Sequence, residues 1–265
     1  MPVHASVDQV NAAGGGAAPQ IELGSNYFED DYFVDRYIPS TTGATFQKWS
    51  TSSLPNISNT VIFHSTSTIP YDNPAAFGEM WLVPTVAGTA VTSGLVRRQN
   101  GSNNDGLVRP INGCRWTSIA KIITPFDGVT NIGGIALGVG GKLDNSDYNM
   151  INGTAMFEAR SGSWECVISQ DVGATRVSPT IGGAITASLL DVTIQHNLAI
   201  EKAAGTLAST AWRFFIDGVL VVTLGGANMP TINMNPFFAL TRTGGNNLGL
   251  PQLIVEYYSL SLWKQ

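Results

Sequence analysis

The amino-acid sequence predicts an all-β protein: an antiparallel β-sandwich with an extended N-terminal arm. Short stretches of alternating apolar and polar residues recur between turn sequences rich in Gly, Asn, Asp and Pro, which is typical of sandwich and barrel strands. No long amphipathic helical pattern competes with them. Charged residues make up 12% of the 265 residues, well below the usual ~25%. Ser, Thr, Asn, Gln and Gly must therefore supply the polar surface.

The clearest local pattern lies between residues 211 and 224, where two apolar runs flank Asp217 and Gly218. An Asp-Gly pair in this position favours a type I′ turn, because both turn residues adopt a positive φ. Side chains alternate along a strand, so Trp212, Phe214 and Ile216 are expected to share one buried face. We interpret the segment as a β-hairpin and Asp217 as a turn former rather than a catalyst.

The remaining chain divides into an arm and one domain. Residues 1–24 lack periodicity and are rich in small residues, so they are interpreted either as a disordered tail or as an arm that orders against a neighbouring subunit. Residues 25–265 are expected to form a single sandwich. Besides the hairpin, its expected strands are residues 45–49, 60–64, 78–83, 89–98, 107–109, 115–123, 132–138, 155–159, 164–169, 191–201, 236–241 and 253–263.

Charge and hydropathy exclude several classes of partner. The net charge is −5, and Arg97, Arg98, Arg109 and Arg115 form no basic run, so no nucleic-acid partner is expected. No apolar stretch approaches the ~18 residues of a membrane span, so no membrane insertion is expected. Residues 1–20 lack a basic segment followed by an apolar core, so folding in the cytoplasm is expected.

The candidate metal ligands and thiols give weak patterns. Asp144 and Asp147 lie in an Asx-rich stretch whose oxygens suit calcium, but the spacing matches no defined calcium loop, and a plain Asx-rich turn is the alternative. No other cofactor is expected. Cys114 and Cys166 match no metal motif and are interpreted as buried small hydrophobes, with a single disulfide as the alternative.

No catalytic residue is predicted. Glu158 and Glu165 are separated by a Ser-Gly-Ser turn, so they are expected to lie on facing strands. There they could form the carboxyl pair that glycoside hydrolysis needs, but we favour the alternative that both residues are structural. Glu29, Asp31 and Asp35 share parity and are interpreted as a solvated acidic face. The three histidines, His4, His64 and His196, lie near no nucleophile motif, and His196 is interpreted as an exposed or satisfied strand residue.

The order of several segments resembles a known family. They are residues 115–122, 132–138, 152–158, 164–168, 196–201, the hairpin, 228–230 and 253–263. Together they make residues 107–265 similar to the concanavalin A-like jelly-roll sandwich of lectin, laminin-G and glucanase-like domains, in the version found in bacteriophage tail, fibre and head-surface proteins. The characteristic Glu-x-Asp-x-(x)-Glu pattern of the glucanase branch is absent.

The resemblance implies a virion structural protein on the particle surface, a capsid decoration, head fibre or tail component, assembled in the host cytoplasm. Self-association through the sandwich and arm, most simply as a trimer, and contacts with other virion proteins would follow. The alternative is a lectin-like receptor-binding module for host surface glycans, with Tyr148 as a loop aromatic for glycan contact. A polysaccharide-degrading enzyme is a third hypothesis, and the missing carboxylate pattern disfavours it.

Overall fold

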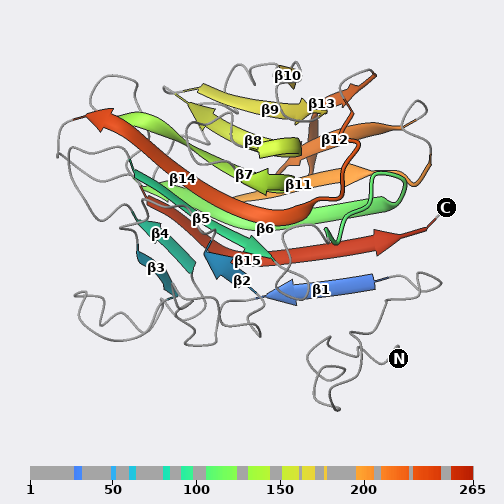
Figure 1. Cartoon of the computed structure of the whole chain (residues 1–265). Coiled ribbons are helices and arrows are strands. Elements are labelled where there is room, and N and C mark those ends of the chain that lie inside the picture. The colour runs from blue at the N-terminus through green and yellow to red at the C-terminus, as the bar shows by residue number, and fades with distance from the viewer. Residues whose placement is uncertain are drawn as a thin grey trace, which may run out of the picture.

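The computed structural model forms two antiparallel β-sheets stacked face to face (Figure 1). The residues that the model describes contain strands and no helix, which confirms the predicted all-β sandwich. No helix in the described part of the chain is long and apolar enough to cross a membrane. The described residues are 27–31, 49–51, 60–63, 80–83, 91–97, 106–123, 131–143, 151–160, 163–170, 176–177, 195–205, 210–226, 229–245 and 252–264.

The first sheet is built around two long central strands, β6 (Gly113–Ile123) and β15 (Gln252–Trp263), which pair along most of their length. Strand β15, the last in the chain, also pairs with the first strand, β1 (Tyr27–Asp31), so both ends of the described chain meet in this sheet. The strand order is β13 (Val219–Gly225), β12 (Ala211–Ile216), β11 (His196–Lys202), β6 (Gly113–Ile123), β15 (Gln252–Trp263), β4 (Met80–Val83) and β3 (Thr60–Phe63), with β1 (Tyr27–Asp31) also paired to β15.

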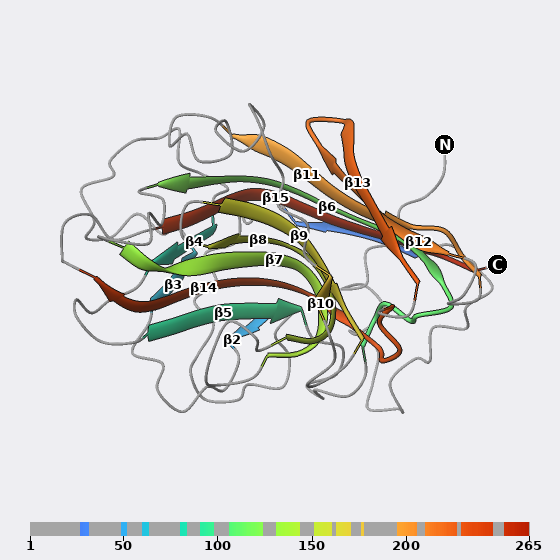
Figure 2. The same cartoon turned by 90° about the horizontal axis from the view of Figure 1, so that it is seen from above.

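The second sheet packs on the first, and its long strands curve away from the first sheet at one end (Figure 2). Strands from before residue 107 pair with later strands in both sheets. The strand order is β10 (Arg176–Val177), β9 (Ser163–Ser169), β8 (Ile151–Arg160), β7 (Asn131–Leu143), β14 (Asn235–Gly245), β5 (Val91–Arg97) and β2 (Trp49–Thr51).

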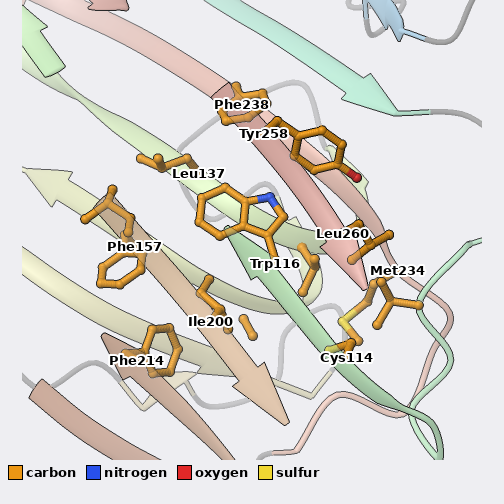
Figure 3. Close-up of a cluster of buried hydrophobic side chains, with 14 of the residues drawn as sticks. Cys114, Trp116, Leu137, Phe157, Ile200, Phe214, Met234, Phe238, Tyr258 and Leu260 are labelled. Atoms are coloured by element: carbon orange, nitrogen blue, oxygen red, sulfur yellow. The ribbon is translucent and has the colours of Figure 1, made fainter. Parts of the chain in front are cut away.

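The main core fills the space between the sheets, and aromatic side chains dominate it. Trp116 lies in the middle of the cluster (Figure 3), with its ring centroid 6.1 Å from that of Phe238. Phe157 and Phe214 meet edge to face across the two sheets, with centroids 5.4 Å apart. Full burial of one such side chain contributes roughly 2–3 kcal/mol. The alternation of Trp212, Phe214 and Ile216 into this core is as predicted.

Two details of the expected strands change. Residues 107–109 form no strand, because only Val108 pairs there, in an isolated bridge with Met234. Because only one residue of this short segment has a partner, no ladder of backbone hydrogen bonds forms along it. Strand β11 begins at His196, and residues 191–194 lie outside the described part of the chain. Of the expected strand 45–49, only Trp49 is described, as the first residue of β2.

Both cysteines are buried and free, in agreement with their interpretation as small hydrophobes. Burial raises the pKa of the Cys114 thiol to about 12 and that of Cys166 well above its ordinary value. The residue paired with Cys114 across β6 and β11 is the buried Lys202. Its Nζ donates hydrogen bonds to the carbonyl oxygens of Asn112, at 3.3 Å, and Ala203, at 3.0 Å, and burial lowers its pKa.

Candidate functional site

The turn of the β12–β13 hairpin is linked to the neighbouring strand β11. Asp217 and Gly218 have φ angles of 50° and 80°. Asp217 accepts a hydrogen bond at Oδ1 from the backbone N–H of Asn197, at 2.9 Å, and its Oδ2 lies 2.6 Å from Nδ1 of His196. His196 is buried and hydrogen-bonded. Asp217 therefore anchors this hairpin besides occupying its turn.

An ion-pair row crosses three adjacent strands on the outer face of the first sheet, the face turned away from the second sheet. Glu201 on β11 lies directly opposite Arg115 on β6 and Arg213 on β12. Arg115 Nη1 donates to Glu201 Oε2 at 2.9 Å, and Arg213 Nη2 donates to Glu201 Oε1. The two arginine side chains are 50% and 45% exposed, whereas Glu201 is 17% exposed. Most of their N–H donors thus remain available to a ligand, since each guanidinium carries five.

A second row of side chains lies beside this ion-pair row. Thr117, Ala199 and Phe215 form that row across the same strands, and Ala199 is only 4% exposed. The guanidinium carbon of Arg115 lies 5.9 Å from the centre of the Phe215 ring. Guanidinium, carboxylate, hydroxyl and aromatic groups therefore gather on one part of this face, which we call the outer-face site.

The second sheet brings the two predicted glutamates together. Glu158 on β8 lies directly opposite Glu165 on β9, as expected for facing strands. Phe157 belongs to the main core and Met156 to a second cluster on the opposite face, so Glu158 shares the outer face of this sheet with Met156. Opposed residues have Cβ atoms about 4.5–5.5 Å apart. Glu158 is completely buried, so its carboxyl group has no access for a polysaccharide.

The interpretation of Glu29 as part of a solvated acidic face is wrong. The Glu29 side chain is buried, and its carboxylate accepts hydrogen bonds from the hydroxyl groups of Tyr27, at 2.6 Å, and Tyr258, at 2.7 Å. Strand β1 pairs with β15, which places Glu29 beside the core strand rather than in water. Asp31 is partly buried, and Asp35 lies outside the described residues.

The candidate calcium ligands Asp144 and Asp147 and the candidate glycan contact Tyr148 also lie outside the described residues. Within the described ranges, no group of three or more His, Cys, Asp or Glu side chains is placed to hold a metal ion. Calcium and the role of Tyr148 stay predictions. The outer-face site uses none of the residues proposed from the sequence for ligand contact.

No protein-family model and no curated protein sequence matches the chain. Solved structures resemble it in fold. The carbohydrate recognition domain of Emp47p is similar with a TM-score of 0.50 and 12% identity, over 90% of this chain and 95% of that one. The fold is a lectin-like β-sandwich. A GlcNAcα1-4Gal-releasing endo-β-galactosidase from Clostridium perfringens is similar with a TM-score of 0.51 and 14% identity, over 92% of this chain and 64% of that one.

A protein of unknown function from Shewanella oneidensis MR-1, SO2946, matches the sandwich over nearly its whole length. Its TM-score is 0.51 at 12% identity, and the match covers 99% of this chain and 96% of that one. The chain spans 40% of the botulinum neurotoxin serotype D binding domain, which matches with a TM-score of 0.44. At these identities the likeness extends to the fold alone, and the sandwich is common to the carbohydrate recognition domain of Emp47p and to the endo-β-galactosidase.

Sequence reasoning missed the outer-face site for a physical reason. Arg115, Glu201 and Arg213 are far apart along the chain and become neighbours only through strand pairing. One local signal was present: Arg115 and Arg213 each lie between two apolar or aromatic residues and Glu201 follows Ile200, so alternation places all three on the exposed face. What alternation leaves open is the register, which decides whether opposite charges meet.

Proposed function

We propose that this protein is a non-catalytic, lectin-like module that binds carbohydrate at the outer-face site. The observation that carries the proposal is the pairing of Arg115, Glu201 and Arg213 in one row beside the ring of Phe215. Sugar sites need an apolar surface together with a few well-oriented polar groups. The outer-face site supplies both on the described strands, with its arginine side chains half exposed.

Each group in the site suits one part of a sugar ring. The edge of the Phe215 ring offers apolar contact for the C–H groups of a pyranose. Arg213 and Arg115 offer paired N–H donors for vicinal hydroxyl oxygens, and Glu201 offers acceptor oxygens for hydroxyl hydrogens. Since Glu201 already holds both guanidinium groups, little side-chain entropy is lost when a ligand binds.

A glycan array followed by calorimetry on the full chain tests this function. We expect a defined set of glycans above background, and binding at least ten-fold weaker in Ala199→Leu, which places a larger side chain between Thr117 and Phe215, and in Arg213→Gln. Arg109→Gln is the matched control, because Arg109 is exposed outside the outer-face site. Unchanged melting temperatures show that the variants fold. Binding that is equal in all three variants, or no glycan bound, would refute the proposal.

A second candidate is a virion surface component, as the family resemblance suggests. It is supported by the low share of charged residues, 12%, which favours protein–protein contacts over repulsion between copies. The mass in solution with and without residues 1–24, and incorporation into particles, test it. A stable monomer that is indifferent to the deletion and fails to join particles would contradict it.

A further inference from the structure

The ion-pair row of the outer-face site carries an excess of positive charge. The guanidinium groups of Arg115 and Arg213 both bond to the single carboxylate of Glu201. Two positive groups and one negative group leave the row with a charge of +1, although the whole chain has a net charge of −5. A ligand with one negative charge would neutralise this row, whereas a neutral sugar would leave it unbalanced.

The neighbouring acidic side chains of the first sheet leave this excess in place. Glu256 forms a pair with Lys121, whose Nζ lies 4.0 Å from Oε1 of Glu256. Asp217 is four residues along the chain from Arg213, roughly 13 Å at the usual rise of a strand. Asp30, on β1, is separated from β6 by β15, which places it two strand spacings, roughly 10 Å, from that strand. Such distances exceed the Debye length of about 8 Å at physiological salt, so these two exposed charges are largely screened from the row.

The two arginines converge on one area of the face. Strand β11 separates their strands, β6 and β12, yet Arg115 Nη1 and Arg213 Nη2 reach the same carboxylate, that of Glu201. Both arginine side chains are half exposed, so their remaining N–H groups border this area and are open to solvent. A planar fork of N–H donors matches the oxygens of a carboxylate or sulfate group. An anionic group of a ligand therefore has donors from both arginines within one small area.

Hydroxyl groups and an aromatic ring extend the row on both sides. Six residues lie side by side in register across six strands that follow one another in the sheet (Figure 1): Phe28, Ser261, Arg115, Glu201, Arg213 and Thr223. None of the six is buried. Neighbouring strands are about 4.8 Å apart, so five spacings give a row of roughly 24 Å. The row thus has room for several sugar rings beside the arginines, with hydroxyl groups to bond them.

We propose that the outer-face site selects acidic saccharides, with one carboxylate or sulfate group bound between Arg115 and Arg213 and the neutral rings lying along the row. The inference rests on the proposed function and specifies its ligand. Each guanidinium is half exposed, so water and salt weaken each contact taken singly. Selectivity for the anion comes from two guanidinium groups that act on it together. Affinity for the acidic ligand should therefore fall as salt is added, because salt screens the attraction.

Matched glycan pairs test the class of ligand. The two members of a pair share one backbone and differ in one group: a uronate and its methyl ester, or a sulfate ester and the free hydroxyl. We expect calorimetry on the full chain to give about ten-fold tighter binding for the acidic member. Raising the salt from about 50 to about 300 mM should weaken that member and leave the neutral one unchanged. The kind of pair that shows the larger difference identifies the anion as carboxylate or sulfate.

Two charge variants test the place where the anion binds. Arg213→Gln should abolish the preference for the acidic member. Thr223→Lys should strengthen its binding several-fold and leave the neutral member unchanged, because Thr223 is exposed and lies directly opposite Arg213. Thr231→Lys is the matched control and should bind like the wild type. Thr231 is exposed, and the next residue, Ile232, lies against Gly153 of the second sheet.

The outcomes separate this inference from the proposed function. Equal binding of both members of every pair would overturn the inference and leave carbohydrate binding in place. A preference for the acidic member that survives in Arg213→Gln would also overturn it, because the anion would then bind elsewhere. Binding of no glycan at all would overturn both proposals. Unchanged melting temperatures show that the variants fold.

Discussion

His196 Nδ1 lies 2.6 Å from Oδ2 of Asp217, so the turn of the β12–β13 hairpin is bonded to the start of β11. Asp217 N also donates to the carbonyl oxygen of Asn197 at 2.8 Å, and Asn197 N returns a bond to Asp217 Oδ1. Asp217 thus bonds to the backbone N–H and C=O of Asn197 and to the buried imidazole of His196. The hairpin that carries Phe215 is held in place by this contact.

Asp217→Ala should lower the free energy of unfolding by about 2 kcal/mol. The change removes two hydrogen bonds from a charged acceptor, and such bonds contribute ~1.5–3 kcal/mol; it also places a Cβ-bearing residue without a polar side chain at positive φ. Asp217→Asn should cost less, since its amide oxygen can still accept from Asn197 and Asn tolerates this backbone. Chemical denaturation measures both. Equal costs for the two variants would contradict the role of the side-chain oxygen that accepts from Asn197.

Glu29→Gln should loosen β1 from β15 and cost about 1–3 kcal/mol. The buried carboxylate accepts from two tyrosine hydroxyls, and an amide presents an N–H group to one of them in place of an acceptor. Hydrogen exchange of the β1 amides measures the loosening. Asp30→Asn, one residue along and exposed, is the control. If both variants exchange like the wild type, the tyrosine–carboxylate contact does not hold the strand.

The pair of Glu158 and Glu165 should show no glycosidase activity. A general acid must reach the glycosidic oxygen, and Glu158 is fully buried. Assays with β-galactans and β-glucans should therefore give the same background for the wild type and for Glu158→Gln. Release of reducing sugar by the wild type that disappears in Glu158→Gln would show that the pair is catalytic.

The stability of Lys202→Met relative to the wild type should depend on pH, because the change removes both the hydrogen bonds of Nζ to Asn112 and Ala203 and an ammonium group whose charged form burial disfavours. Burial lowers the pKa of Lys202 below its ordinary 10.5. Between the folded-state pKa and 10.5 the unfolded chain binds more protons, so the wild type gains stability as pH rises through that window.

The stability of Lys202→Met relative to the wild type should accordingly be highest below the folded-state pKa of Lys202 and fall towards pH 10.5. Denaturation at several pH values measures it. The thiol of Cys114 interacts with Lys202 electrostatically, so Cys114→Ala is introduced into both proteins to isolate Lys202. A relative stability that stays constant with pH would mean that the pKa of Lys202 is the same in the folded and unfolded states.

Local patterns in the sequence were sufficient for the strands with strong alternation. The hairpin at residues 211–224 was predictable because Asp217-Gly218 and the flanking apolar runs act over a few residues. The burial of Cys114 and Cys166 was predictable because a free cysteine behaves as a small apolar residue. Strand 107–109 failed, because three residues of alternation cannot show whether a partner strand continues beside them.

By itself the amino-acid sequence determined the all-β class, the alternation that directs Trp212 inward and Arg213 outward, and the facing arrangement of Glu158 and Glu165. Those properties depend on neighbours along the chain. Only the tertiary structure decided that Glu201 lies between two arginines, that Glu29 is buried, and that Cys114 lies opposite Lys202. Pairing between distant strands sets these features, and a shift of one residue in register would reverse the face of every side chain on a strand.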